Sequence, residues 1–375
     1  MINFDNAATT FPKPSSVEDA AVTALRKYGG NPGRSGHTLS LDTAKAVYDV
    51  RNACAEFFEA NAENVIFTLN CTHALNLAIK GIMTPGDHII ASGIEHNSVA
   101  RPVFALSAHG CTYDLARVSS DDNETASNFE ALIRSNTKAI VCTAASNVSG
   151  QLLPYRQLGA LCRKHGICFI VDGAQACGIL PIALSDGINI LCTAGHKGLY
   201  GPAGTGLLIT DGKFPLDTIM EGGTGSSSLE LAQPDFLPDQ LESGTINTVG
   251  VIGLGAGLRF VQSKSMDRIF KHEEGLCGQL IQGIQKLPGM HIYRQDGVSY
   301  VPIVSFNLDG YSANELAQLL SDKGFALRGG LHCAPLAHHT LGTAPEGTVR
   351  FAPSAFNHSD QVIFLINTLK KLVKS

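Results

Sequence analysis

Lys197 is the residue whose surroundings point most directly to chemistry. It lies in Gly-His-Lys-Gly, just after a short apolar run. A primary amine forms a Schiff base only in its neutral form, so a catalytic lysine needs burial or nearby positive charge to lower its pKa. His196 and the flanking glycines suit a tight, partly desolvated surrounding. We therefore predict that Lys197 binds an aldehyde cofactor; the alternative is an exposed loop lysine.

Asp172 supplies a carboxylate of complementary chemistry. It directly follows the apolar run Ile167 to Val171. A carboxylate at that place is suited to pair with a protonated ring nitrogen, which makes the ring an electron sink. Gln175, three residues later, is then suited to reach the edge of the ring. The alternatives are a helix N-cap aspartate and an ordinary glutamine of the first helical turn.

Three further polar positions follow other apolar runs. Cys71-Thr72-His73 precedes a helix-like stretch, so its backbone donors and the Thr72 hydroxyl suit a phosphate without basic residues. His96 is suited to stack on a flat ring, and Asn147 to donate to a ring oxygen or a substrate carboxylate. The alternatives are a helix cap for Thr72, a loop histidine for His96 and a turn asparagine for Asn147.

The elements that must position these residues form an alternating pattern. Short apolar runs, several rich in Ile and Val, alternate with longer helix-like stretches, which predicts an α/β domain with a mostly parallel sheet. Ligands bind such sheets at the carboxyl ends of the strands. The expected strands are Asn64 to Thr68, Asp87 to Ser92, Lys138 to Thr143, Ile167 to Val171, Ile188 to Cys192 and Gly206 to Thr210. The expected helices are Leu41 to Phe58, Ala74 to Ile82 and Tyr155 to His165.

The pattern changes near residue 250, so we predict a large domain over residues 1–250 and a smaller one over 251–375. Residues 1–15 are expected to pack on the smaller domain. Its expected elements are a helical stretch from Arg259 to Leu287, a strand from Val301 to Leu308, a helix from Ala313 to Lys323 and a helix from Gln361 to Lys374 capped by Ser359.

Composition excludes several classes of protein. The chain has 375 residues, 44% hydrophobic and 16% charged, with a formal net charge of -5, which argues against a nucleic-acid surface. The absence of a leader-like N-terminus and of a long apolar run predicts a cytoplasmic protein without membrane contact.

The ten cysteines are expected to be thiols, mostly in the core. One cluster resembles a metal site but lacks standard zinc spacing, so no metal is predicted. Its members are His332, Cys333, His338 and His339.

Taken together, the chain from Asn3-Phe-Asp-Asn-Ala-Ala-Thr-Thr to its last helix resembles the fold-type I pyridoxal-phosphate enzymes. Within them it is similar to the class V aminotransferase group, which contains cysteine desulfurases and selenocysteine lyases. The resemblance implies pyridoxal 5'-phosphate as cofactor, a homodimer, and a large domain with a mostly parallel seven-stranded sheet beside a smaller C-terminal α+β domain. Cys71 and Ala194 depart from the hydroxyl residues frequent in the family.

The resemblance also implies a role for each site residue. Cys333, in Arg328-Gly-Gly-Leu-His-Cys-Ala-Pro, matches the persulfide-forming cysteine, with Arg328 and His332 nearby to favour its thiolate. Arg350 matches the arginine that binds the substrate carboxylate, and Arg34 an arginine at the entrance; the alternative for either is a surface ion pair. The implied cofactor contacts are Lys197 at the aldehyde, Asp172 at the ring nitrogen, Gln175 at the phenolic oxygen, His96 on the ring, Thr72, His73 and His196 at the phosphate, Asn147 beside the ring, and Thr245 at the phosphate of the neighbouring subunit.

The implied activity converts L-cysteine to L-alanine and leaves a persulfide on Cys333 for a sulfur-acceptor protein. Selenocysteine lyase, with L-selenocysteine as substrate, and another class V lyase or aminotransferase remain alternatives, because all would use Lys197 and Asp172. A non-enzymatic scaffold in sulfur trafficking is a different class of hypothesis. The hypothesis of a dinucleotide-binding enzyme has the least support, since Gly253-Leu-Gly-Ala-Gly lies in a helical stretch and lacks the full dinucleotide-binding fingerprint.

Overall fold

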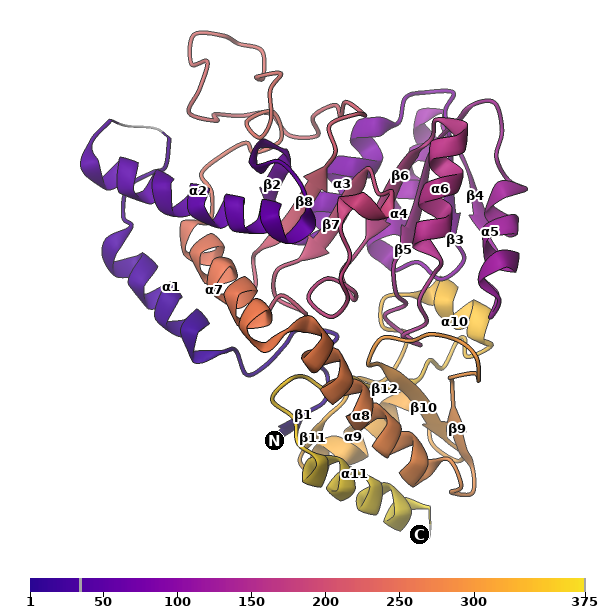
Figure 1. The fold of residues 1–375 in the computed structure, drawn as a ribbon. Coiled ribbons are helices and arrows are strands. Elements are labelled where there is room, and N and C mark those ends of the chain that lie inside the picture. Colours follow the sequence, from indigo (N-terminus) through magenta and orange to yellow (C-terminus); the bar gives the residue numbers. More distant parts are fainter. Residues whose placement is uncertain (34–35, 374–375) are drawn as a thin grey trace.

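The computed structural model describes residues 1–33 and 36–373. Its centre is a seven-stranded sheet in the order β2-β8-β7-β6-β5-β3-β4 (Figure 1). All neighbouring strands are parallel except at β8, which runs antiparallel to both β2 and β7. The strands are β2 (Val65–Thr68), β3 (His88–Ser92), β4 (Thr112–Ala116), β5 (Thr137–Thr143), β6 (Cys168–Asp172), β7 (Ile190–Ala194) and β8 (Gly206–Thr210).

Helices cover both faces of this sheet because its strands are apolar on both sides. One face packs against α2 (Thr38–Phe58), α5 (Asp122–Glu130), α6 (Tyr155–His165) and α7 (Thr248–Lys264). The other face packs against α3 (Cys71–Ile82) and α4 (Asn97–Leu106). Helix α1 (Ser15–Lys27) packs against α7 outside these layers. The prediction of an α/β fold with a mostly parallel sheet is confirmed.

A smaller antiparallel sheet lies below the central one in Figure 1, in the order β12-β10-β9. The first strand of the chain pairs in parallel with β11, so the N-terminus joins this part of the molecule. The elements here are β1 (Ile2–Asn3), α8 (Met266–Ile284), β9 (Met290–Ile292), β10 (Val304–Leu308), α9 (Ala313–Asp322), β11 (Phe325–Ala326), α10 (Pro335–Leu341), β12 (Val349–Phe351) and α11 (Ser359–Leu372).

The structure corrects three sequence-based expectations. The helical stretch from Arg259 to Leu287 is two helices, α7 and α8, because the backbone at Ser265 adopts a φ of 70° and breaks the helical path. The N-cap of α11 is His358 rather than Ser359, and Gln361 accepts the His358 backbone N–H. Strand β4 was not predicted, because this edge strand is only partly buried and lacks an unbroken apolar run.

Within the described residues, no helix is both long enough and apolar enough to cross a membrane.

Candidate active site

A cavity of about 180 Å³ lies at the carboxyl ends of β5, β6 and β7 and at the start of α3 and α4. Parallel strands bring their carboxyl ends to one edge of the sheet, so residues far apart in sequence meet there. The cavity joins seven of the predicted site residues: Thr72, His96, Asn147, Asp172, Gln175, His196 and Lys197.

Lys197 lines the cavity from the loop that follows β7. Burial lowers the pKa of its amine; the neighbouring Asp172 opposes this, and Arg350 and Arg328 add to it. The loop is held tightly, since the Lys197 carbonyl accepts from Thr10 Oγ1 at 2.9 Å. At Gly198 an added Cβ would lie 2.4 Å from the carbonyl oxygen of Cys177, so the glycine beside the lysine is required by close packing. The amine is therefore positioned and partly desolvated.

Asp172 ends β6, and its side chain is 4% exposed. Its Oδ1 accepts the Ala174 backbone N–H at 2.9 Å and the Cys71 thiol at 3.4 Å. The residues after it form turns rather than a helix, so it is not a helix N-cap. Within the described part of the chain Asp172 forms no ion pair. A buried carboxylate without a cation is costly, which suits this side chain to a protonated ring nitrogen.

His96 is the N-cap of α4, and burial lowers the pKa of its imidazole to about 4. Its Nδ1 accepts the Ser98 backbone N–H at 3.0 Å and lies 2.8 Å from Ser98 Oγ. The same Oγ lies 2.8 Å from Thr72 Oγ1. Thr72 is in the first turn of α3, whose N-cap is Asn70, so Thr72 itself is not the cap. The cavity thus lies at the start of two helices, where backbone dipoles favour an anion.

His196 leaves a nitrogen without a partner beside the cavity. Its Nδ1 is buried and has no hydrogen-bond partner among the described residues. Burial, Lys197 and Lys13 lower the pKa of its ring to about 4, and Lys13 Nζ donates to its carbonyl at 2.8 Å. A buried, unpaired ring nitrogen on a residue that lines a cavity is suited to a bound polar group.

Two amide side chains use one N–H each to fix neighbouring backbone. Gln175 Nε2 donates to the Ala7 carbonyl at 3.0 Å, and Asn147 Nδ2 donates to the His332 carbonyl at 2.8 Å. Each NH₂ group has a second hydrogen for another acceptor.

Two predicted cofactor contacts lie elsewhere. His73 and Thr245 line a separate cavity of about 90 Å³ and do not line the Lys197 cavity. Arg34 lies outside the described residues.

Arg350 is held from two sides and is 1% exposed. Its Nη1 donates to the Asn147 carbonyl at 2.9 Å, and its Nη2 donates to Asp5 Oδ1 at 2.7 Å. Its Nε is buried without a partner among the described residues. An Arg N–H without a partner in a buried place is suited to a bound anion such as a carboxylate.

Cys333 is exposed, whereas the other nine cysteines are buried and all ten are free thiols. Arg328 Nη2 lies 3.3 Å from its Sγ, and Asn97 donates its backbone N–H to the Cys333 carbonyl at 2.8 Å. His332 and Cys333 both have positive φ, 50° and 57°, a strained conformation for residues with side chains. Arg328 also pairs with Arg350 as an isolated antiparallel bridge, which brings the two arginines together.

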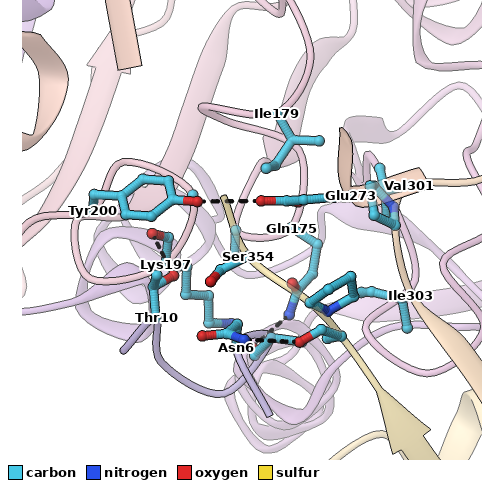
Figure 2. A pocket seen from close by; sticks show the side chains of 16 residues that line it. Asn6, Thr10, Gln175, Ile179, Lys197, Tyr200, Glu273, Val301, Ile303 and Ser354 are labelled. Atoms are coloured by element: carbon cyan, nitrogen blue, oxygen red, sulfur yellow. Dashed lines mark hydrogen bonds between the residues drawn. The ribbon is translucent and has the colours of Figure 1, made fainter. Parts of the chain in front are cut away.

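The structure adds Asp5, Ser98, Tyr200 and Glu273 to the site. Lys197 also lines an inner cavity of about 40 Å³, in which Glu273 is 3% exposed and Tyr200 donates to its carboxyl at 3.2 Å. Figure 2 shows the Tyr200 and Glu273 side chains pointing toward each other. Asp5 lies inside the N-terminal motif and Ser98 two residues after His96, so their positions offered a local signal. Glu273 gave no such local signal, because its contact with Tyr200 joins segments far apart in the sequence.

No group of three or more His, Cys, Asp or Glu residues suited to hold a metal ion occurs among the residues that the structure describes. In the predicted cluster, the His332 Nε2 contacts the Thr348 carbonyl at 2.9 Å and His338 Nδ1 contacts Thr343 Oγ1 at 2.7 Å.

Residues 2–365 match the family model of the class V aminotransferases. The chain is 28% identical to a probable cysteine desulfurase of Methanothermobacter thermautotrophicus, over 98% of this chain and 94% of the relative. It is 30% identical to a probable cysteine desulfurase of Xylella fastidiosa, over 100% of this chain and 91% of the relative. The apo structure of a cysteine desulfurase from Thermococcus onnurineus superposes with a TM-score of 0.93 at 29% identity, over 100% of this chain and 94% of that one. The chain therefore belongs to the class V aminotransferase family, whose enzymes depend on pyridoxal 5'-phosphate.

Proposed function

We propose that this protein is a pyridoxal-phosphate-dependent cysteine desulfurase, which converts L-cysteine to L-alanine and transfers the sulfur to Cys333. The observation that carries the proposal is the exposed Cys333 thiol, held 3.3 Å from Arg328 and linked through Asn97 to the helix that His96 caps. The names of the similar proteins support the same reaction.

The cavity fits the cofactor by the chemistry of its lining. Lys197 offers a desolvated amine for the aldehyde, and Asp172 a buried carboxylate for the ring nitrogen. The unpaired Nδ1 of His196 and the helix start at Thr72 suit the phosphate, while Gln175 and Asn147 each keep an N–H for the ring oxygens. When bound, the cofactor would withdraw electrons from the α-carbon of the substrate and so weaken the bonds to it.

Arg350 would bind the substrate carboxylate. Its unpaired Nε–H is available to a carboxylate, and Asp5 and the Asn147 carbonyl fix the plane of the guanidinium. Lys197, once free of the cofactor, would take the α-proton at Nζ, because its lowered pKa leaves the amine available as a base.

Cys333 would then receive the sulfur. Its thiolate attacks the substrate sulfur; a sulfur–sulfur bond forms as the carbon–sulfur bond breaks, and the carbon keeps the electron pair and takes up a proton. The products are alanine and a Cys333 persulfide, whose outer sulfur passes to a sulfur-acceptor protein.

A homodimer belongs to the same proposal. Thr245 lies outside the Lys197 cavity of its own chain, so a phosphate contact through its hydroxyl needs a second subunit. Leu229 and Leu231, in the segment that leads to Thr245, are 98% and 106% exposed and would be covered there. A light-scattering mass of one chain, measured on the cofactor-loaded protein, would exclude the dimer.

The decisive experiment measures alanine formed from L-cysteine and from L-selenocysteine by wild type and Cys333→Ala. We expect alanine formation from L-cysteine to fall by about a hundredfold or more in Cys333→Ala, while the cofactor's absorption band stays. If Cys333→Ala still forms alanine from L-selenocysteine at the wild-type rate, and from L-cysteine as well, the protein is a selenocysteine lyase or another lyase of the family. Buried Cys111→Ala is the matched control, because its thiol lies in the core and contacts the Thr84 carbonyl.

A further inference from the structure

A chain of three polar side chains joins the two helix starts beside the cavity. His96 Nδ1 lies 2.8 Å from Ser98 Oγ, which lies 2.8 Å from Thr72 Oγ1. One further contact determines which group donates in each of these hydrogen bonds: the Ser98 backbone N–H donates to the same Nδ1 at 3.0 Å.

A backbone N–H can only donate, so the Nδ1 of His96 must be an acceptor and carries no proton. The Ser98 hydroxyl must then donate to Nδ1 as well. Because that hydroxyl has a single hydrogen, the Thr72 hydroxyl is the donor in its contact with Ser98. The neutral ring therefore carries its proton on Nε2, which has no hydrogen-bond partner among the described residues and belongs to a ring that lines the cavity.

We propose that Ser98 is a positioning residue that holds His96 in the Nε2–H tautomer, so that His96 acts as a fixed hydrogen-bond donor toward the cavity and does not carry protons. The basic nitrogen of the ring is Nδ1, and two donors from Ser98 already occupy it. Protonation there would break the bond from the Ser98 backbone N–H, which can only donate, and the Ser98 hydroxyl would have to turn from donor to acceptor. The other ring nitrogen, Nε2, can donate a hydrogen bond but cannot accept a proton.

Burial and three of the four charges around the ring act in the same direction as the Ser98 contacts, and the Asp172 carboxylate acts against them. Burial lowers the pKa of His96, Asp172 raises it, and Lys197, Arg328 and Arg350 lower it, which leaves it at about 4. The ring is thus neutral at physiological pH. The proposal rests on the proposed function, because it concerns what His96 offers to cofactor and substrate in that cavity.

The test follows the protonation of His96 in the cofactor-loaded enzyme labelled with [¹⁵N]histidine, whose nitrogen chemical shifts report the tautomer and the charge. The His96 signals are assigned by their loss in His96→Gln. Wild type should show Nε2 protonated and Nδ1 bare. Ser98→Ala should raise the pH at which the ring becomes charged by roughly one unit, the effect of one lost hydrogen bond. Ser98→Thr, which keeps the hydroxyl, should restore the wild-type value.

Ser107→Ala is the matched control, since Ser107 ends the same helix and its hydroxyl donates to the Phe104 carbonyl, away from His96. It should leave the His96 titration unchanged. Should Ser98→Ala lose the cofactor, Ser98→Cys replaces it, and its weaker thiol donor should give a smaller upward shift.

A wild-type ring protonated at Nδ1, or an unchanged titration in both Ser98→Ala and Ser98→Cys, would overturn the proposal. Failure of the proposed function looks different: no cofactor band at all, or no alanine from L-cysteine.

The dependence of the reaction rate on pH gives a second measurement. In wild type, protonation of His96 should not lower the reaction rate above about pH 5. In Ser98→Ala the fall in rate should begin at a higher pH, and in Ser107→Ala it should begin at the wild-type pH.

Discussion

Asp5 gives the buried Arg350 a counter-charge, because its carboxylate lies 2.7 Å from Nη2 and is the ion-pair partner of this arginine within the described residues. A buried cation that loses its partner is strongly destabilising. The buried Nε of Arg350 keeps its N–H without a partner among the described residues. In the proposed function, Asp5 and the substrate carboxylate would be two anionic partners of the same cation.

Asp5→Asn should lower the melting temperature, with a loss of stability of about 3–5 kcal/mol. A carboxylate ligand such as L-alanine should restore part of that loss, since it supplies the missing negative charge, and the rise in melting temperature with ligand should exceed that of wild type. Thermal unfolding with and without L-alanine measures both. Asp49→Asn is the control, because Asp49 pairs with Lys45 on the exposed face of α2. An equal ligand effect in Asp5→Asn and wild type would contradict the role.

The candidate site was predictable where a residue of suitable chemistry stands at or just after the end of a strand, as Asp172 and Lys197 do. Strand ends are marked by the apolar runs before them, and parallel strands bring those ends together. The contacts of Asp5 and Ser98 could not be predicted in this way. The pairing of Asp5 with Arg350 and of Ser98 with Thr72 arises from tertiary packing, and the sequence around each residue does not specify these distant partners.

Helix α7 owes its position to glycines. An added Cβ at Gly257 would lie 2.3 Å from the Leu199 carbonyl oxygen and 2.8 Å from the Gly201 nitrogen. At Gly253 it would lie 2.6 Å from a ring carbon of Pro202. These glycines let the helix approach the loop that carries Lys197. Gly253 and Gly257 thus form a packing surface in the middle of a helix. They do not belong to a dinucleotide-binding turn.

Gly257→Ala should destabilise the protein by about 1–3 kcal/mol, since the atoms in the way are backbone and cannot rotate aside. It should also weaken cofactor retention, because Leu199 follows Lys197 by two residues. Gly275→Ala in α8 is the control: nothing lies within 4 Å of its added Cβ, so it should stabilise by about 0.5–1 kcal/mol. Chemical denaturation and dialysis of the bound cofactor measure the two effects. Equal retention in both variants would contradict the role of α7.

The elements themselves follow from apolar periodicity with few exceptions. The bounds of α6 and β8 match the predicted ranges, because their patterns are bounded by Gly166 and by Gly206. The break at Ser265 was not predictable, since a serine favours no positive φ and the surrounding pattern remains amphipathic. Strand β4 depends on pairing with β3 rather than on its own residues.

Across the molecule, pH should act through buried carboxyl groups. Burial raises the pKa of Glu273 to about 8 from 4.5, and that of Glu95 likewise to about 8. The folded state then binds these protons more tightly than the unfolded state. Their contribution to stability is complete below about pH 4.5 and is lost as the pH rises toward 8.

Glu273→Gln should flatten the fall in melting temperature between pH 5 and 8, because the amide stays neutral and still accepts the Tyr200 hydroxyl. Thermal unfolding across this range measures the slope for wild type and variant. Glu274→Gln is the control on the same turn of α8, since it removes a partner of Arg294 and leaves the buried carboxyl in place. Wild-type and Glu273→Gln curves that stay parallel would show that Glu273 is ionised throughout.

The pairing of β1 with β11 has a consequence for biosynthesis. Phe4 follows β1, is fully buried, and packs against Phe351 with ring centroids 4.5 Å apart. A ribosome makes Ile2–Asn3 long before their partner Phe325–Ala326. Until then an apolar segment has no core to join. We expect folding of this region to be a late event, in which two segments more than three hundred residues apart meet and bring Asp5 to Arg350.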